Sequence, residues 1–167
     1  MGDPAYGAAL RYLGRRDHFR SELAEKLRRK GFEEDAVEAA LDRCEGANLL
    51  DDERLAGRFA QIRSEANGWG PRRIEAELRR RGVARGIAEE AARLDPDRLR
   101  SALATALRRA QIRAPDGWWR VSARRARMVS SLIARGFAAD DAIGAVDSLA
   151  ESREKSDHAF DDESGNP

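Results

Sequence analysis

The sequence predicts an all-α protein built as three tandem three-helix repeats that form an elongated, curved helical array. Ala, Leu, Glu and Arg dominate the 167 residues, and all four favour helices. Apolar residues recur at helical spacing, whereas strand patterns of period two are missing. Gly31, Gly82 and Gly136 lie 51 and 54 residues apart and mark an internal repeat. Because each unit of such a chain packs mainly on its neighbours, we expect an extended array.

The surroundings of the three glycines repeat as well. Each glycine lies four positions after a Leu, directly follows a basic residue and directly precedes an apolar one. These residues are Leu27, Lys30 and Phe32 in the first repeat, Leu78, Arg81 and Val83 in the second, and Leu132, Arg135 and Phe137 in the third. Glycine in the left-handed conformation ends a helix, and a basic residue suits the negative helix terminus. The pattern therefore predicts a helix that ends at each glycine.

Periodicity and local signals together predict nine helices. Asp51 or Asp52 is a suitable N-cap for the fourth helix. Pro71 suits the first position of the fifth helix, and Asp95-Pro96 interrupts the chain before the seventh. The predicted helices cover residues 6–14, 17–30, 34–46, 52–66, 71–81, 84–94, 96–112, 119–135 and 139–149.

The predicted helices and the composition together divide the chain into five segments. An N-terminal arm covers residues 1–8, and the three repeats cover 9–50, 51–95 and 96–149. Residues 150–167 are rich in Ser, Asp and Glu and have few apolar side chains to offset the entropy of ordering. We therefore expect 150–167 to be an acidic, disordered tail.

The net charge of +1 hides an uneven distribution. Residues 1–150 hold 29 basic and 24 acidic side chains, whereas residues 151–167 hold 2 and 6. Three basic residues in a row at a helix end cannot all face a core, so part of each such cluster must be exposed. Repeated exposed cations could follow a phosphate backbone or an acidic filament groove. The alternative is a solvated face with ion pairs such as Glu25 with Arg29.

The candidate binding residues are the basic side chains at matching places in the repeats. They are Arg15, Arg16, Arg28, Arg29, Lys30, Arg72, Arg73, Arg79, Arg80, Arg81, Arg120, Arg124, Arg125 and Arg127. Trp69, Trp118 and Trp119 lie near the loops between first and second helices of a repeat. They either fill the junctions between repeats or stack on a base or a partner.

Catalysis, metal binding and membrane insertion are not indicated. One Cys and two His are too few for a disulfide framework or a zinc cluster, and no nucleotide-binding glycine motif occurs. Cys44 falls on an apolar helix stripe, as an inert buried thiol would, and His18 suits a helix entry. No apolar run approaches the roughly 20 residues of a membrane helix. We therefore expect a cytoplasmic protein that is not an enzyme and has no cofactor or metal.

Several segments carry a resemblance to a known family. In the first repeat they are Ala9-Leu10-Arg11-Tyr12-Leu13, Arg15-Arg16-Asp17-His18, Arg20-Ser21-Glu22-Leu23 and Leu27. In the second they are Asp51-Asp52-Glu53-Arg54-Leu55-Ala56, Gly68-Trp69-Gly70-Pro71, Ile74, Glu77-Leu78 and Gly82-Val83, and in the third Arg135-Gly136-Phe137. In order and spacing these segments resemble the RecX family, the regulators of the RecA recombinase. The resemblance runs from about residue 9 to 149.

The resemblance implies three three-helix repeats, which the glycine pattern predicts independently. It also implies a monomer that binds RecA filaments along the groove and inhibits ATP hydrolysis and strand exchange. Such a protein modulates recombination, DNA repair and the SOS response, and weak contact with single- or double-stranded DNA is a further expectation.

Two other functions fit the residues. The first is direct DNA binding through helix-turn-helix units. The third helix carries the acidic side chains Glu38, Asp42 and Glu45, which DNA phosphate would repel, so insertion of this helix into a groove is disfavoured. The second is a non-catalytic helical adaptor for another partner, which fits the composition equally well.

Overall fold

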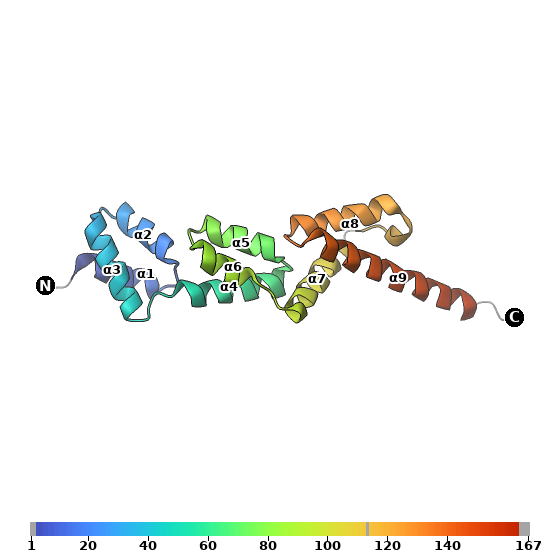
Figure 1. Cartoon of the computed structure of the whole chain (residues 1–167), viewed down its shortest axis with the longest axis horizontal. Coiled ribbons are helices and arrows are strands. Elements are labelled where there is room, and N and C mark those ends of the chain that lie inside the picture. The colour runs from blue at the N-terminus through green and yellow to red at the C-terminus, as the bar shows by residue number, and fades with distance from the viewer. Residues whose placement is uncertain (1–2, 113, 164–167) are drawn as a thin grey trace. The chain divides into compact units, whose positions relative to one another are not determined.

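The computed structural model describes residues 3–112 and 114–163 of the chain. Within these ranges the fold is all-α, as predicted, with nine α-helices, one short 3-10 helix and no strand (Figure 1). The α-helices are α1 (Pro4–Leu13), α2 (Arg20–Arg29), α3 (Glu34–Gly46), α4 (Asp52–Asn67), α5 (Pro71–Arg80), α6 (Arg85–Ala92), α7 (Pro96–Gln111), α8 (Ser122–Ala134) and α9 (Ala139–Glu163). The 3-10 helix, η1 (Trp118–Arg120), precedes α8.

Aspartate caps fix the starts of three helices. Asp51 Oδ1 accepts the amide of Arg54 at 2.9 Å, so Asp51 rather than Asp52 caps α4. Asp95 caps α7 in the same way through the amide of Arg98. Asp3 accepts the amide of Ala5 at 2.9 Å and starts α1 at Pro4. Helix α1 therefore begins two residues before the predicted start at residue 6, within the segment predicted as an arm.

The glycine turns predicted at the ends of α2, α5 and α8 are confirmed. Gly31, Gly82 and Gly136 have φ angles of 85°, 76° and 92°, the left-handed region. After each glycine, the amide of the next residue donates back to the carbonyl of the Leu five positions before it, which is the Schellman motif. The bonds are Phe32 to Leu27 at 3.4 Å, Val83 to Leu78 at 3.1 Å and Phe137 to Leu132 at 3.3 Å.

The chain divides into two compact units. Unit 1 comprises the residues up to 61 together with 74–93, and unit 2 comprises 62–73 together with the chain from 94 onward. The division runs through α4 and α5, so each unit includes part of the second predicted repeat. Unit 1 buries a cluster from α1, α2 and α3 that includes Leu23, Leu27 and Leu41. Unit 2 buries a cluster from α7, η1, α8 and α9 that includes Leu132 and Phe137.

Our expectation of a disordered tail from residue 150 is wrong for the part that the structure describes. Helix α9 continues to Glu163, and residues 164–167 lie outside the described residues. Ala150 is 1% exposed in the unit 2 core. Asp157 Oδ2 pairs with Arg120 Nη2 at 2.7 Å, and the Arg153 guanidinium lies 6.0 Å from the centre of the Trp119 ring. These tertiary contacts offset ordering entropy that the tail's own composition cannot.

Candidate functional site

The predicted basic residues all lie where a partner can reach them. Eleven are exposed, and three (Arg81, Arg124 and Arg125) are half-buried. The exposed ones are Arg15, Arg16, Arg28, Arg29, Lys30, Arg72, Arg73, Arg79, Arg80, Arg120 and Arg127. Exposure alone does not make a binding residue, because a cation that is already paired within the chain offers less to a partner. The pairing of each side chain therefore separates the candidates.

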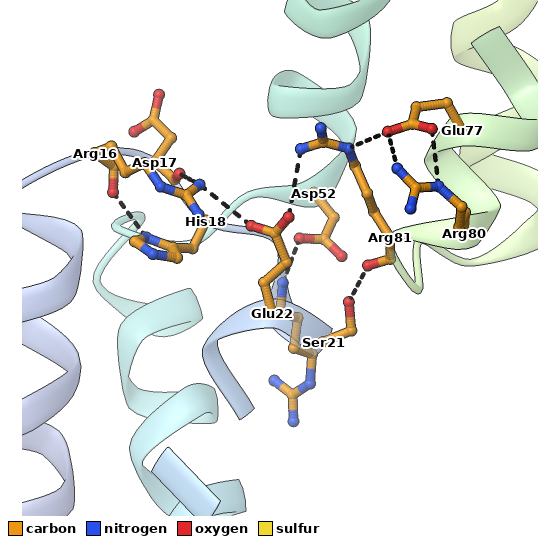
Figure 2. Close-up of polar contacts among 10 residues, drawn as sticks. Arg16, Asp17, His18, Ser21, Glu22, Asp52, Glu77, Arg80 and Arg81 are labelled. Carbon is orange, nitrogen blue, oxygen red and sulfur yellow. Dashed lines mark hydrogen bonds and ion pairs between the residues drawn. The ribbon is translucent and has the colours of Figure 1, made fainter. Parts of the chain in front are cut away.

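In unit 1, three of the candidates form one ion-pair network between α2 and α5 (Figure 2). Glu22 pairs with Arg16 at 3.2 Å and with Arg81 at 3.4 Å. Glu77 accepts two hydrogen bonds from Arg80, at 3.0 and 2.8 Å, and one from Arg81 at 3.1 Å. The Arg80 guanidinium is the main cause that holds the pKa of Glu77 below its usual range. Arg16, Arg80 and Arg81 therefore stabilise a contact within the chain.

The basic cluster at the end of α2 is also largely occupied. Arg28 binds Glu34 with two donors, one of them Nε at 2.7 Å, and this contact lowers the pKa of the Glu34 carboxyl. Arg29 lies 4.0 Å from Glu25, which is the predicted pair. The Lys30 ammonium lies 5.5 Å from the centre of a Tyr12 ring and has no carboxylate partner among the described residues.

Two further candidates of unit 1 lack a carboxylate partner among the described residues. Arg15 in the loop after α1 and Arg79 on α5 are exposed and form no ion pair with any described residue. Arg79 follows Glu75 by four positions, as Arg81 follows Glu77, yet only Arg81 is paired. Of the consecutive residues Arg79, Arg80 and Arg81, Arg79 is therefore the one that forms no ion pair with a described residue.

In unit 2, Arg72 and Arg73 lie in the first turn of α5. The Arg73 guanidinium lies 4.2 Å from the centre of the Trp69 ring, and the Arg63 guanidinium lies 5.0 Å from it. Trp69 is half-buried between them. Trp69 therefore packs against these two arginines at the start of α5, which is a structural role. Neither Arg72 nor Arg73 forms an ion pair with a carboxylate among the described residues.

Arg124 and Arg127 line a pocket of about 280 Å³ in unit 2. Arg109 and Arg135 complete its basic rim, and Trp118 and Met128 are among its apolar lining residues, with no carboxylate. Three of these arginines donate to main-chain oxygens: Arg109 to Ala66 at 2.6 Å, Arg135 to Asn67 at 3.1 Å and Arg124 to Asp116 at 3.3 Å. The pocket thus concentrates positive charge beside an apolar surface.

The remaining candidate arginines and the tryptophans of unit 2 differ in how far a partner could contact them. Arg120 is paired with Asp157, whereas Arg125 forms no ion pair with a described residue. Trp118 is 4% exposed, so it belongs to the core. Trp119 is half-buried and meets Trp118 edge to face at 6.0 Å between ring centres. Of the two predicted roles for the tryptophans, packing inside the protein or stacking on a partner, packing therefore applies to Trp118.

Sequence reasoning missed the most heavily bonded arginine of unit 1, Arg20. Its guanidinium binds Glu38 at 2.6 Å, Asp42 at 2.9 Å and Glu45 at 2.9 Å. These hydrogen bonds raise the pKa of Arg20 despite its partial burial. The amide of Arg20 also donates to Asp52 Oδ1 at 2.8 Å. The acidic face of α3 therefore holds the start of α2 in place. The spacing of Glu38, Asp42 and Glu45, at positions i, i+4 and i+7 of one helix, is the sequence pattern that could have predicted this face.

No candidate metal centre is found among the described residues. They contain no group of three or more His, Cys, Asp or Glu placed to hold a metal ion. Cys44 is fully buried, and burial raises the pKa of its thiol, which disfavours the reactive thiolate. In the part of the chain that the structure describes, no helix has both the length and the apolar character to span a bilayer.

His18 precedes α2 and is 4% exposed, and this burial is the main cause that lowers its pKa. Its Nδ1 lies 2.9 Å from the Arg16 carbonyl oxygen (Figure 2). The folded chain therefore binds a proton on His18 less readily than the unfolded chain does, in which histidine has its ordinary pKa of about 6.5. We therefore expect the free energy of unfolding to fall as the pH drops below about 6.5.

A His18→Asn variant retains a donor near the Nδ1 position and has no titration. Urea unfolding of both proteins between about pH 7.5 and pH 5 should show a shallower decline for the variant. Equal slopes would exclude His18 as the source of the pH dependence.

Comparison with known proteins then identifies the family. The model of the first three-helix domain of RecX matches residues 5–44, and that of the second matches residues 51–91. The Regulatory protein RecX of Prosthecochloris aestuarii is 36% identical over 133 residues, which cover 80% of this chain and 85% of that one. The chain belongs to the RecX family. The RecX of Halorhodospira halophila is 48% identical over 83 residues, or about half of each chain.

Solved RecX structures agree with the fold. The crystal structure of RecX from Lactobacillus salivarius superposes with a TM-score of 0.76 over 87% of this chain and 94% of that chain, at 24% identity. A second RecX crystal structure gives a TM-score of 0.68 at 22% identity. These similarities show the all-helical RecX fold.

The RecX domain models cover ten of the fourteen candidate residues. Those of unit 1, together with Arg72 and Arg73, lie within residues 5–44 or 51–91. The four that fall outside both models are Arg120, Arg124, Arg125 and Arg127. For these four the assignment stays a prediction from the sequence.

Proposed function

We propose that this RecX-family chain is a non-catalytic, cytoplasmic regulator that binds RecA filaments, along the filament groove, and inhibits ATP hydrolysis and strand exchange. It would thereby modulate recombination, DNA repair and the SOS response. The observation that carries the proposal is the 36% identity over 133 residues to a protein named Regulatory protein RecX. The segments that suggested the family from the sequence lie largely within the matched domains, residues 5–44 and 51–91.

Unpaired cations support a polyanionic partner such as a protein–DNA filament. Each unit exposes arginines that form no ion pair with described residues: Arg15 and Arg79 in unit 1, and Arg72 and Arg127 in unit 2. Such charges raise the rate of encounter with a polyanion and contribute to affinity through release of counterions.

Direct, weak binding to single- or double-stranded DNA is a second candidate. The pocket rimmed by Arg109, Arg124, Arg127 and Arg135 favours it, because no carboxylate among its lining residues would repel phosphate. Insertion of α3 into a groove is disfavoured, since Arg20 already occupies the acidic face of that helix.

The decisive experiment is a titration of DNA-dependent ATP hydrolysis by RecA, with co-pelleting of filaments as the binding control. We expect substoichiometric protein to slow hydrolysis and to pellet with RecA on single-stranded DNA. No slowing together with no pelleting at saturating protein would refute the proposal. Tight, sequence-specific binding to duplex DNA without RecA would establish the second candidate instead.

Charge reversal tests which cations take part. We expect Arg79→Glu and Arg127→Glu each to weaken filament binding by about tenfold and to reduce the salt slope by about one, since each removes a cation that forms no ion pair with a described residue. Arg93→Glu is the matched control, because Arg93 is exposed, pairs with Glu90 at 3.0 Å and lies outside the candidate set. Filament pelleting at several salt concentrations gives both quantities, and equal salt slopes in all four proteins would exclude these two arginines.

A further inference from the structure

The glycine turns that end α2, α5 and α8 share one backbone geometry but not one environment. Each has a left-handed glycine and a basic residue directly before it, at Lys30, Arg81 or Arg135. A Cβ placed on Gly82 or Gly136 would collide with another segment at 2.5 or 2.4 Å, whereas one placed on Gly31 would meet nothing within 4 Å. Two of the turns are therefore occupied by a neighbouring segment, and the third is open.

The occupant of the Gly82 turn is the first turn of helix α2 (Figure 2). Ser21 Oγ lies against Gly82 and donates to the Arg81 carbonyl oxygen at 2.5 Å. Glu22, the next residue of α2, pairs with the Arg81 guanidinium at 3.4 Å. In this junction the hydroxyl of Ser21 bonds to the main-chain carbonyl of the glycine turn, and the carboxylate of Glu22 pairs with the basic side chain of that turn.

The occupant of the Gly136 turn is likewise the start of a helix, here α5. The amide of Gly70 donates to the Arg135 carbonyl at 2.8 Å, and the amide of Arg72 donates to the Gly136 carbonyl at 3.1 Å. The first amides of a helix and the last carbonyls of another have no partners within their own helices, so the two ends complement each other. Their helix dipoles are complementary as well.

The Gly31 turn offers the same groups without an occupant. The carbonyls of Lys30 and Gly31 accept no hydrogen bond from any described residue. Lys30 stands where Arg81 contacts Glu22 in the first junction, and it has no carboxylate partner among the described residues. The turn therefore presents exposed carbonyls that have no partner among the described residues, next to a lysine that has no carboxylate partner there.

We propose that the Gly31 turn docks the first turn of an α-helix of the RecA filament, one with a small residue facing Gly31 and an Asp or Glu that pairs with Lys30. This inference rests on the proposed function. Bare phosphate suits the turn poorly, because the open carbonyls accept hydrogen bonds and repel anions. In both occupied turns the occupant is the second helix of the preceding repeat, so a second copy added in the same order would present the start of α8. That helix suits the turn poorly, because it has no acidic residue in its first turn and carries Arg124 and Arg125 there.

The test compares variants in filament pelleting with RecA on single-stranded DNA. Gly31→Asn fills the docking surface, and Asn tolerates the left-handed conformation better than other side chains. Lys30→Glu reverses the charge. Gly117→Asn is the matched control, because Gly117 also has a positive φ, 65°, and open space around its Cβ position. Circular dichroism verifies that all three variants fold.

We expect Gly31→Asn and Lys30→Glu to weaken filament binding by about tenfold, and Gly117→Asn to bind as the wild type does. If wild type and Gly31→Asn bind equally, the inference fails while the proposed function stands. If RecA filaments do not retain the wild-type chain, both fail. If Gly31→Asn instead loses binding to DNA alone, or dissociates a dimer seen by sedimentation, the turn binds nucleic acid or a second copy and the assignment is wrong.

Discussion

Replacing Leu132 by alanine is expected to lower the free energy of unfolding of unit 2 by about 2–5 kcal/mol. Leu132 is fully buried in α8, within the cluster that contains Ala106, Trp118 and Phe137. Its carbonyl also accepts the amide of Phe137 in the glycine turn. Truncation removes buried methyl groups and leaves a cavity. Because the glycine turn fixes α9 against α8, these helices cannot easily move together to fill the cavity.

Tryptophan fluorescence during urea unfolding measures this loss directly, because Trp69, Trp118 and Trp119 all lie in unit 2. Ile133→Ala is the matched control, since Ile133 is the next residue of α8 and is 42% exposed. We expect the control to change the free energy by about 0.5 kcal/mol or less. The equivalent substitution in unit 1, Leu27→Ala, should cause a similar loss by circular dichroism. Unchanged transitions in both Leu variants would refute the alignment of the repeats.

The sequence predicted most of the fold because its signals are local. Helix starts depend on caps such as Asp51 and on Pro71, and helix ends depend on Gly31, Gly82 and Gly136, so neighbouring residues determine them. The end of α9 was mispredicted because its order depends on distant contacts. The bond between Asp157 and Arg120, 37 positions apart, does not follow from the composition of the tail.

The candidate site was predicted less completely, for the same reason. Clusters of basic residues predicted exposure correctly, but their pairing depends on which carboxylates the fold brings near. Spacing of four residues suggests Glu75 with Arg79 as strongly as Glu77 with Arg81, and only the second pair forms. Glu77 and Arg81 face α2, where Glu22 extends the network. Arg109 was missed because only the fold brings it to the carbonyl of Ala66, 43 positions away.

Replacing Gly136 by alanine is expected to lower the free energy of unfolding by about 2–5 kcal/mol, and two separate effects contribute. The left-handed φ of 92° penalises any Cβ by about 1–2 kcal/mol. The new Cβ would also lie 2.4 Å from the Arg73 amide nitrogen, which belongs to the backbone and cannot rotate away. Overpacking of this kind costs about 1–3 kcal/mol.

Gly31→Ala isolates the first effect. Gly31 has nearly the same φ, 85°, but its Cβ would meet nothing within 4 Å. We therefore expect it to lose only about 1–2 kcal/mol in urea unfolding. The difference between the two variants measures the tightness of the junction in unit 2, where Gly136 accepts the amide of Arg72. Equal losses would mean that the start of α5 yields to the extra methyl group, and the fit between helix start and glycine turn would then be loose.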